Sequence, residues 1–134
     1  MNKNEIYIKT GTQYKEMTKA LLTQCNLAAQ ISDTDMQIGI KPNLVSPSEA
    51  SWGATTHPEI VAGIIEYLQE NGYRKIAVLE GSWVGDKTTE AYEVCGYREL
   101  SERYQVPFWD MQKDKGIERD CGGVKLNICE RVAN

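Results

Sequence analysis

The stretch RKIAVLEGS, residues 74–82, decides the fold class of this chain. Its centre, residues 76–79, is a run of four apolar residues without polar alternation, and two of the four are β-branched. Such a run is typical of a strand covered on both faces, as in a parallel sheet flanked by helices. The run ends at Glu80-Gly81-Ser82, where polar and small residues predict a turn. We therefore expect residues 76–79 to form a buried strand of a parallel sheet.

A helix is predicted immediately before this strand. Thr56 and Glu59 fit a T-x-x-E capping box, and Pro58 suits the first turn, where its missing N–H costs nothing. The pair Asn71-Gly72 predicts a left-handed stop. The apolar residues between these signals recur at helical spacing and are Ile60, Val61, Ile64, Ile65 and Leu68.

The rest of the chain alternates strand patterns with helix patterns. Further strands are predicted at residues 5–9, 36–40, 106–110 and 124–129. Further helices are predicted from Thr12, as the N-cap, to Ala28, over 89–95, and around Leu100 and Tyr104. The charged residues 113–119 are expected to be an exposed connection. Strand–helix–strand order implies right-handed crossovers, so we predict one α/β domain over residues 1–134 with a three-layer, mostly parallel, Rossmann-like sheet.

Length and charge exclude several classes of protein. The chain has 134 residues, of which 15 are basic and 19 are acidic, and its formal net charge is −4. A mildly acidic chain without a basic stripe is a poor candidate for nucleic-acid binding. The longest apolar stretch, residues 60–65, is too short to span a bilayer, and the first residues lack a secretory apolar core. We therefore expect a cytoplasmic protein with neither a nucleic-acid partner nor a membrane partner.

The cysteines predict no metal site. They are Cys25, Cys95, Cys121 and Cys129. No two of them form a C-x-x-C pair, whereas zinc and iron–sulfur motifs use tighter spacing. The single histidine of the chain also excludes a histidine-rich metal site. We expect reduced thiols that pack as small apolar groups, and no iron–sulfur cluster held by this chain.

One edge of the predicted sheet carries a group of polar residues. Ligands of open parallel sheets bind beyond the carboxyl ends of the strands, and two predicted strands end at residues 40 and 79. The loop 41–56 that follows the first of them is unusually long and is expected to be functional. We expect one crevice at this edge, lined by Lys41, Asn43, Thr55, Thr56, His57, Glu80 and Ser82.

These residue types suit an anionic small molecule. A helix N-terminus offers free N–H groups and a partial positive charge, and Lys41 adds a full charge. In an enzyme, His57 or Glu80 would transfer a proton, while Asn43 and Ser82 would orient the ligand.

The same residues also have structural interpretations. Thr56 can serve as a helix cap, and a histidine beside a cap is most often structural. Glu80 would repel an anion unless it pairs with Lys41, binds a sugar hydroxyl or acts as a base. Trp52 and Trp83, in the two loops, either stack on a ligand or close over the core.

Three segments resemble one protein family. IKPNLV at 40–45, ATTHPE at 54–59 and IAVLEGS at 76–82 are similar, in that order, to the amino-terminal part of the domain of unknown function 362 family. The resemblance covers about residues 36–110 and implies an α/β protein. Members are often described as iron–sulfur cluster-binding proteins, but this chain lacks their closely spaced cysteines. The resemblance therefore implies no cluster, no defined cofactor and no defined reaction, and it predicts that the chain corresponds to the front portion of the family's domain.

Three functional hypotheses follow. The favoured one is a pocket for an anionic small molecule at the carboxyl ends of the parallel strands, with the question of catalysis left open. The second is a non-catalytic binding module, for example one that docks a redox partner. The third is a truncated, inactive fragment that forms homo-oligomers to cover an exposed sheet edge.

Overall fold

The computed structural model of the protein describes residues 4–31 and 33–133. The α-helices are α1 (Tyr14–Gln24), α2 (Pro58–Glu70), α3 (Thr88–Val94), α4 (Tyr97–Tyr104) and α5 (Glu130–Ala133). The strands are β1 (Ile38–Ile40), β2 (Ile76–Glu80), β3 (Phe108–Asp110), β4 (Gly116–Asp120) and β5 (Lys125–Cys129). The 3₁₀ turns are η1 (Leu27–Gln30), η2 (Ala50–Trp52) and η3 (Met111–Lys113). No helix among the described residues is long and apolar enough to cross a membrane.

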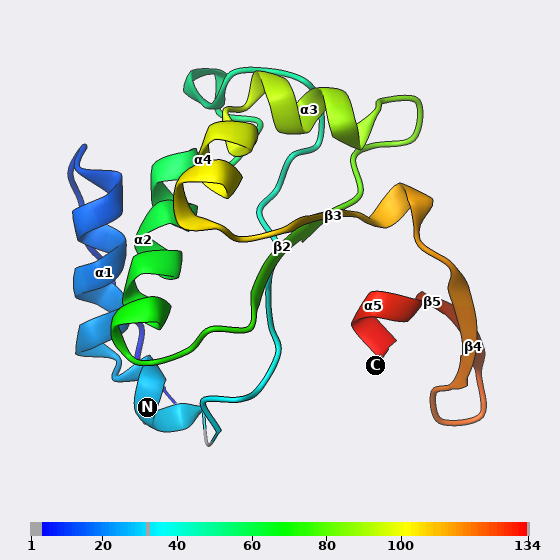
Figure 1. Cartoon of the computed structure of the whole chain (residues 1–134), viewed down its shortest axis with the longest axis horizontal. Helices are drawn as coiled ribbons and strands as arrows, with labels where there is room; N and C mark the ends of the chain where they lie inside the picture. The colour runs from blue at the N-terminus through cyan, green and yellow to red at the C-terminus, as the bar shows by residue number, and fades with distance from the viewer. Residues whose placement is uncertain (1–3, 32, 134) are drawn as a thin grey trace.

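A three-stranded sheet in the order β1-β2-β3 lies at the centre of the molecule (Figure 1). Both strand pairs are parallel, with Ile40 opposite Val78 and Glu80 opposite Asp110. Every residue of β2 is buried, as expected for a central strand without polar alternation. The predicted buried strand and its parallel neighbours are therefore confirmed.

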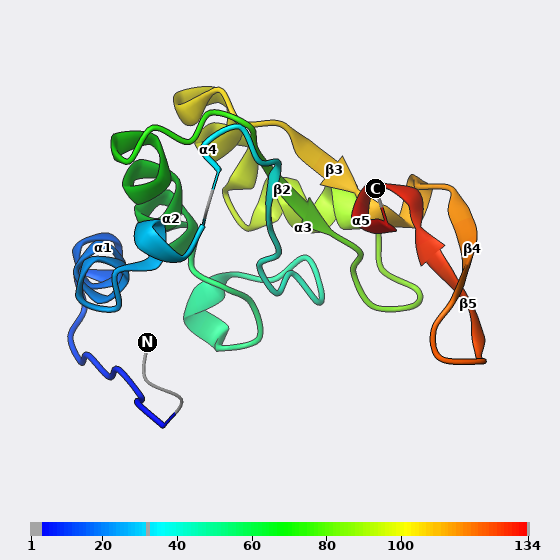
Figure 2. The same ribbon diagram turned by 90° about the horizontal axis from the view of Figure 1, so that it is seen from below.

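Helices α2, α3 and α4 pack on one face of this sheet. Ile40, Ile76 and Val78 belong to one core cluster with Val61 and Ile65 of α2. The strands are added in one direction, so right-handed crossovers place α2 and the α3–α4 pair on the same face. Figure 2 shows α1, α2 and α4 at one end of the view and the β4–β5 hairpin at the other, with the sheet between them. The structure is thus a mixed α/β fold built on a parallel sheet. The second face of the sheet is turned toward the β4–β5 hairpin and α5.

Three local predictions are wrong. Residues 5–9 lie outside any strand, with Ile6 85% and Ile8 81% exposed, because alternation forms no strand without a neighbour to share its hydrogen bonds. Residues 113–119 are more than a connection, since they include most of β4, which pairs antiparallel with β5. Because the hairpin is largely exposed, β4 has a mostly charged sequence that lacks the apolar alternation typical of a strand. The N-cap of α1 is Gln13 rather than Thr12.

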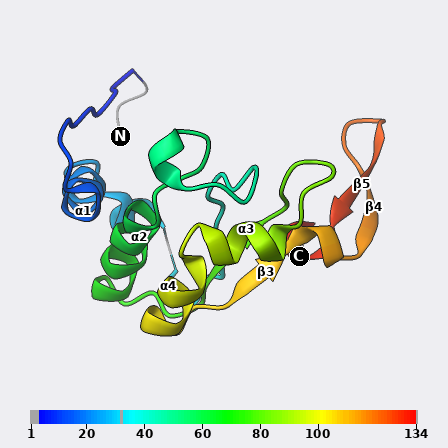
Figure 3. The same ribbon diagram turned by 90° about the horizontal axis from the view of Figure 1, so that it is seen from above.

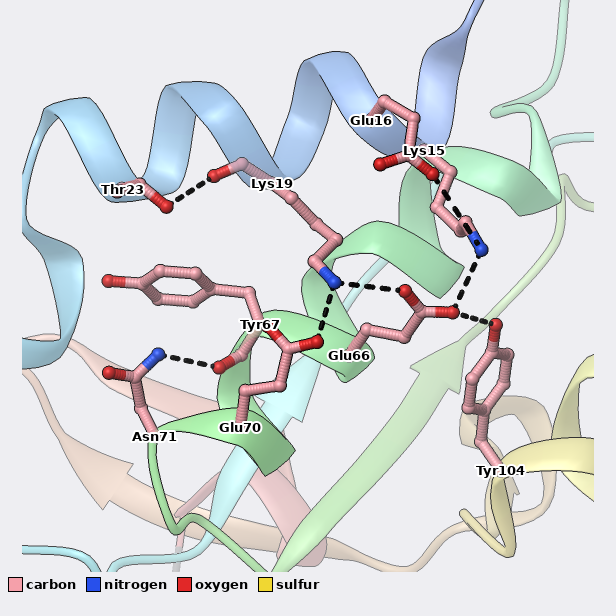
Figure 4. Close-up of polar contacts among 9 residues, drawn as sticks. All are labelled: Lys15, Glu16, Lys19, Thr23, Glu66, Tyr67, Glu70, Asn71 and Tyr104. Carbon is pink, nitrogen blue, oxygen red and sulfur yellow. Dashed lines mark hydrogen bonds and ion pairs between the residues drawn. The ribbon is translucent and has the colours of Figure 1, made fainter.

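An ion-pair network fastens α1 to α2 and α4 (Figure 4). The carboxylate of Glu66 accepts hydrogen bonds from Lys15 at 3.0 Å, Lys19 at 3.2 Å and the Tyr104 hydroxyl at 2.7 Å. Partial burial raises the pKa of Glu66, but these three donors outweigh burial and lower the pKa to about 2. The helices also approach closely at Gly63, where a Cβ atom would lie 2.6 Å from the carbonyl oxygen of Lys15.

Candidate functional site

The parallel pairing of β1 and β2 brings Lys41 and Glu80 together at the carboxyl edge of the sheet. Lys41 directly follows β1, and Glu80 is the last residue of β2. Their Nζ and Oε2 atoms lie 2.9 Å apart. The side chain of Glu80 is only 4% exposed, whereas that of Lys41 is 60% exposed. Glu80 therefore forms the ion pair with Lys41 that was one of the three roles considered for it.

Glu80 also holds the start of the long loop against the sheet. Its Oε2 atom accepts a hydrogen bond from the backbone N–H of Leu44 at 3.3 Å, and its Oε1 atom accepts one from Gly81 at 2.7 Å. Both carboxylate oxygens are thus engaged by the protein. This buried carboxylate organises the loop because it accepts hydrogen bonds from one ammonium group and two backbone N–H groups.

Thr56 and Asn43 join the two ends of the same loop. The Thr56 hydroxyl accepts a hydrogen bond from the Asn43 backbone N–H at 2.9 Å, and the Asn43 side-chain amide donates to the carbonyl of Ala54 at 2.8 Å. The Thr55 hydroxyl donates to the carbonyl of Ser48 at 3.1 Å. The predicted capping box is therefore wrong: α2 begins at Pro58, and its N-cap, which has no side-chain capping bond, is His57.

Ser82 ties the loop after β2 to the loop after β1. Its hydroxyl donates to the carbonyl of Leu44 at 2.7 Å, and the backbone N–H of Trp83 donates to the carbonyl of Val45 at 3.0 Å. The backbone N–H of Ser82 in turn donates to the Thr88 hydroxyl at 3.0 Å. Figure 3 shows both loops on the same side of the molecule. Six of the seven predicted site residues, all except His57, thus belong to one bonded framework, in which Lys41 and Glu80 join the two loops to the sheet.

His57 lies apart from this framework. Its ring stacks on Tyr14 of α1, with ring centroids 4.3 Å apart and planes inclined by 30°. Its Nδ1 atom lies 3.9 Å from the carboxylate of Glu59. This contact directs the histidine toward α1, and His57 does not line the cleft described next. The loop tryptophans Trp52 and Trp83 are 78% and 68% exposed, so neither closes over the core.

A cleft of about 620 Å³ lies between the second face of the sheet and the carboxyl-terminal hairpin. On the sheet side it is lined by Gln37, Gly39, Lys41, Leu79, Trp109 and Met111. On the other side it is lined by Ile128, Cys129, Arg131 and Val132. The charged residues of this lining, Lys41 and Arg131, are both basic.

Arg131 belongs to α5 and was missed by the analysis of the sequence. Its guanidinium carbon lies 4.5 Å from the centre of the Trp109 ring, a cation–π contact between α5 and β3. Its backbone N–H donates to the carboxylate of Asp114 at 2.9 Å. The sequence signal that could have found it is the glycine turn at 121–123 followed by the strand pattern at 124–129, which returns the chain to the sheet.

The cysteines are not joined by disulfides. Cys95 is buried, Cys25 and Cys129 are half-buried, and Cys121 is exposed. Within residues 4–31 and 33–133, no group of three or more His, Cys, Asp or Glu side chains is placed to hold a metal ion.

Comparison with known proteins gives the family of the chain. The family model for the domain of unknown function (DUF362) matches residues 38–134, which include the parallel sheet, both loops and the whole lining of the cleft except Gln37. The chain therefore belongs to this family. No curated protein and no solved structure matches it.

Proposed function

We propose that this protein binds an anionic small molecule in the cleft on the second face of the parallel sheet. The observation that carries the proposal is the charge of the lining: in a chain of net charge −4, both charged residues of this cleft are basic. Lys41 pairs with Glu80, yet its ammonium has three donors and its side chain is 60% exposed. The guanidinium group of Arg131 adds several coplanar N–H donors, a geometry that suits the binding of carboxylates and phosphates.

The size and place of the cleft also support binding of a small molecule. Its volume of about 620 Å³ falls within the usual range of ligand sites, about 300–1,000 Å³. Open parallel sheets bind ligands near the carboxyl ends of their strands, where Lys41 and Met111 lie. Asn43, Thr55, Thr56 and Ser82 support such a site by fixing the loops around Lys41.

The proposal is tested with a charged probe and its neutral analogue. We expect benzoate to bind at least about tenfold more tightly than benzamide, because hydrogen bonds to charged groups contribute about 1.5–3 kcal/mol. Arg131→Met should remove most of this preference in isothermal titration. The control is Lys113→Met, which removes an exposed lysine that pairs with Asp110 outside the cleft. Equal affinity for the two probes would contradict the proposal.

A catalytic role stays a prediction for His57 and Glu80. If His57 transfers protons, His57→Ala will abolish turnover of the natural substrate and leave the fold intact. A loss of stability without a change in activity would make the histidine structural. Docking of a redox partner, homo-oligomer formation, a cytoplasmic location, an association with iron–sulfur proteins and a Rossmann-like third layer also stay predictions.

A further inference from the structure

We propose that the ligand of the cleft is amphipathic, with one acidic group and an apolar body, as in a medium-chain acyl carboxylate. This inference rests on the proposed function, because it takes the acidic group from the basic lining. It adds the chemistry of the remainder of the ligand, which charge alone does not define.

The apolar body is indicated by the rest of the lining. Leu79, Trp109 and Met111 present apolar surface from the sheet side, and Ile128 and Val132 face them from the hairpin and α5. Besides the two basic residues, Gln37 supplies the remaining polar side chain of this lining. A bare inorganic anion would leave this apolar surface in contact with water, whereas a hydrocarbon body would cover it.

The sheet wall of the cleft has room for a hydrocarbon chain over β1. One wall is the sheet, and the other is the hairpin with α5. At Gly39 the sheet wall carries no side chain, and Leu79 lies over it so closely that a Cβ atom at Gly39 would meet Leu79 Cδ2 at 2.7 Å. The wall over β1 is therefore formed by the Leu79 side chain packed on Gly39. A hydrocarbon chain can lie along this wall while its acidic group reaches Lys41 or Arg131.

A series of straight-chain carboxylates tests the inference. We expect the Kd, measured by isothermal titration of the intact chain, to fall about fourfold for each methylene from butanoate through hexanoate to octanoate. Hexan-1-ol, which has the same body without the charge, should bind at least about tenfold more weakly than hexanoate.

Matched variants localise the effect. Val132 lines the cleft and is 55% exposed, so Val132→Asp should preserve the fold while weakening octanoate binding at least about tenfold. The control is Val84→Asp at a position that is 91% exposed and lies in the loop after β2, and this variant should bind octanoate like the parent.

The outcomes separate the two proposals. A Kd that does not change with chain length would overturn the amphipathic ligand and leave the anion proposal standing. Equal binding of hexanol and hexanoate would overturn the anion proposal, and with it the inference as stated. Absence of binding for the whole series, or equal effects of the two aspartate variants, would also overturn the inference.

Discussion

Glu80→Ala should be among the most destabilising substitutions at the carboxyl edge of the sheet. The change removes the acceptor for Lys41, Leu44 and Gly81. Leu44 is fully buried, so its N–H would lose its partner at a cost of about 1–3 kcal/mol. Gly81 and the ammonium of Lys41 are exposed and can bind water instead, so the cost of about 3–5 kcal/mol for breaking a fully buried pair does not apply.

The expected loss of unfolding free energy is about 3 kcal/mol for Glu80→Ala, including the cavity left by the side chain. Glu80→Gln keeps one acceptor oxygen and should lose about 1–2 kcal/mol. Urea unfolding followed by circular dichroism measures both values. A double-mutant cycle with Lys41→Met should give a coupling of about 0.5–1 kcal/mol, because one partner is exposed. A loss below about 0.5 kcal/mol for Glu80→Ala would refute the view that this carboxylate organises the loop.

Three further predictions concern packing and charge. Glu66→Gln should lower the free energy of unfolding by about 1–2 kcal/mol at pH 7. Because the folded-state pKa of Glu66 is lowered from 4.5 to about 2, urea titrations should show this difference above pH 4.5 and its loss as the pH falls toward 2. Gly63→Ala should destabilise by about 1–3 kcal/mol although alanine is the better helix former, since its Cβ would collide with the Lys15 carbonyl; a higher Tm in calorimetry would count against this packing. Thr56→Val should cost about 1 kcal/mol by removing the acceptor for Asn43, while Thr56→Ser should unfold like the parent, and equal losses in the two variants would exclude the hydrogen bond as the cause.

The sequence predicted the centre of the fold well, for a physical reason. An apolar run such as residues 76–79, short and rich in β-branched residues, favours a strand covered on both sides, and the helix before it has Pro58 in its first turn and Asn71 at its end. Parallel pairing followed from the order of the elements and brought Lys41 to Glu80. The buried strand, the helix before it and their parallel arrangement could thus be predicted from the apolar pattern and the order of the elements alone.

Features that depend on distant partners were not predictable in this way. The sequence around Thr56 fits a helix cap, but the hydroxyl is taken by Asn43, thirteen residues earlier. His57 lies at the start of α2 as expected, where it is the N-cap, but its ring stacks on Tyr14 of another helix. Arg131 reaches the cleft because the exposed β4–β5 hairpin folds back to the sheet, and its charged sequence carries no strong strand signal.

The most direct test of the central claim is a crystal structure of the protein grown with octanoate. We predict density in the cleft, with the carboxylate within hydrogen-bond distance of Lys41 or Arg131 and the hydrocarbon chain lying between Leu79 and Ile128. An empty cleft at a saturating concentration of octanoate, or a carboxylate bound only elsewhere on the protein, would contradict the claim.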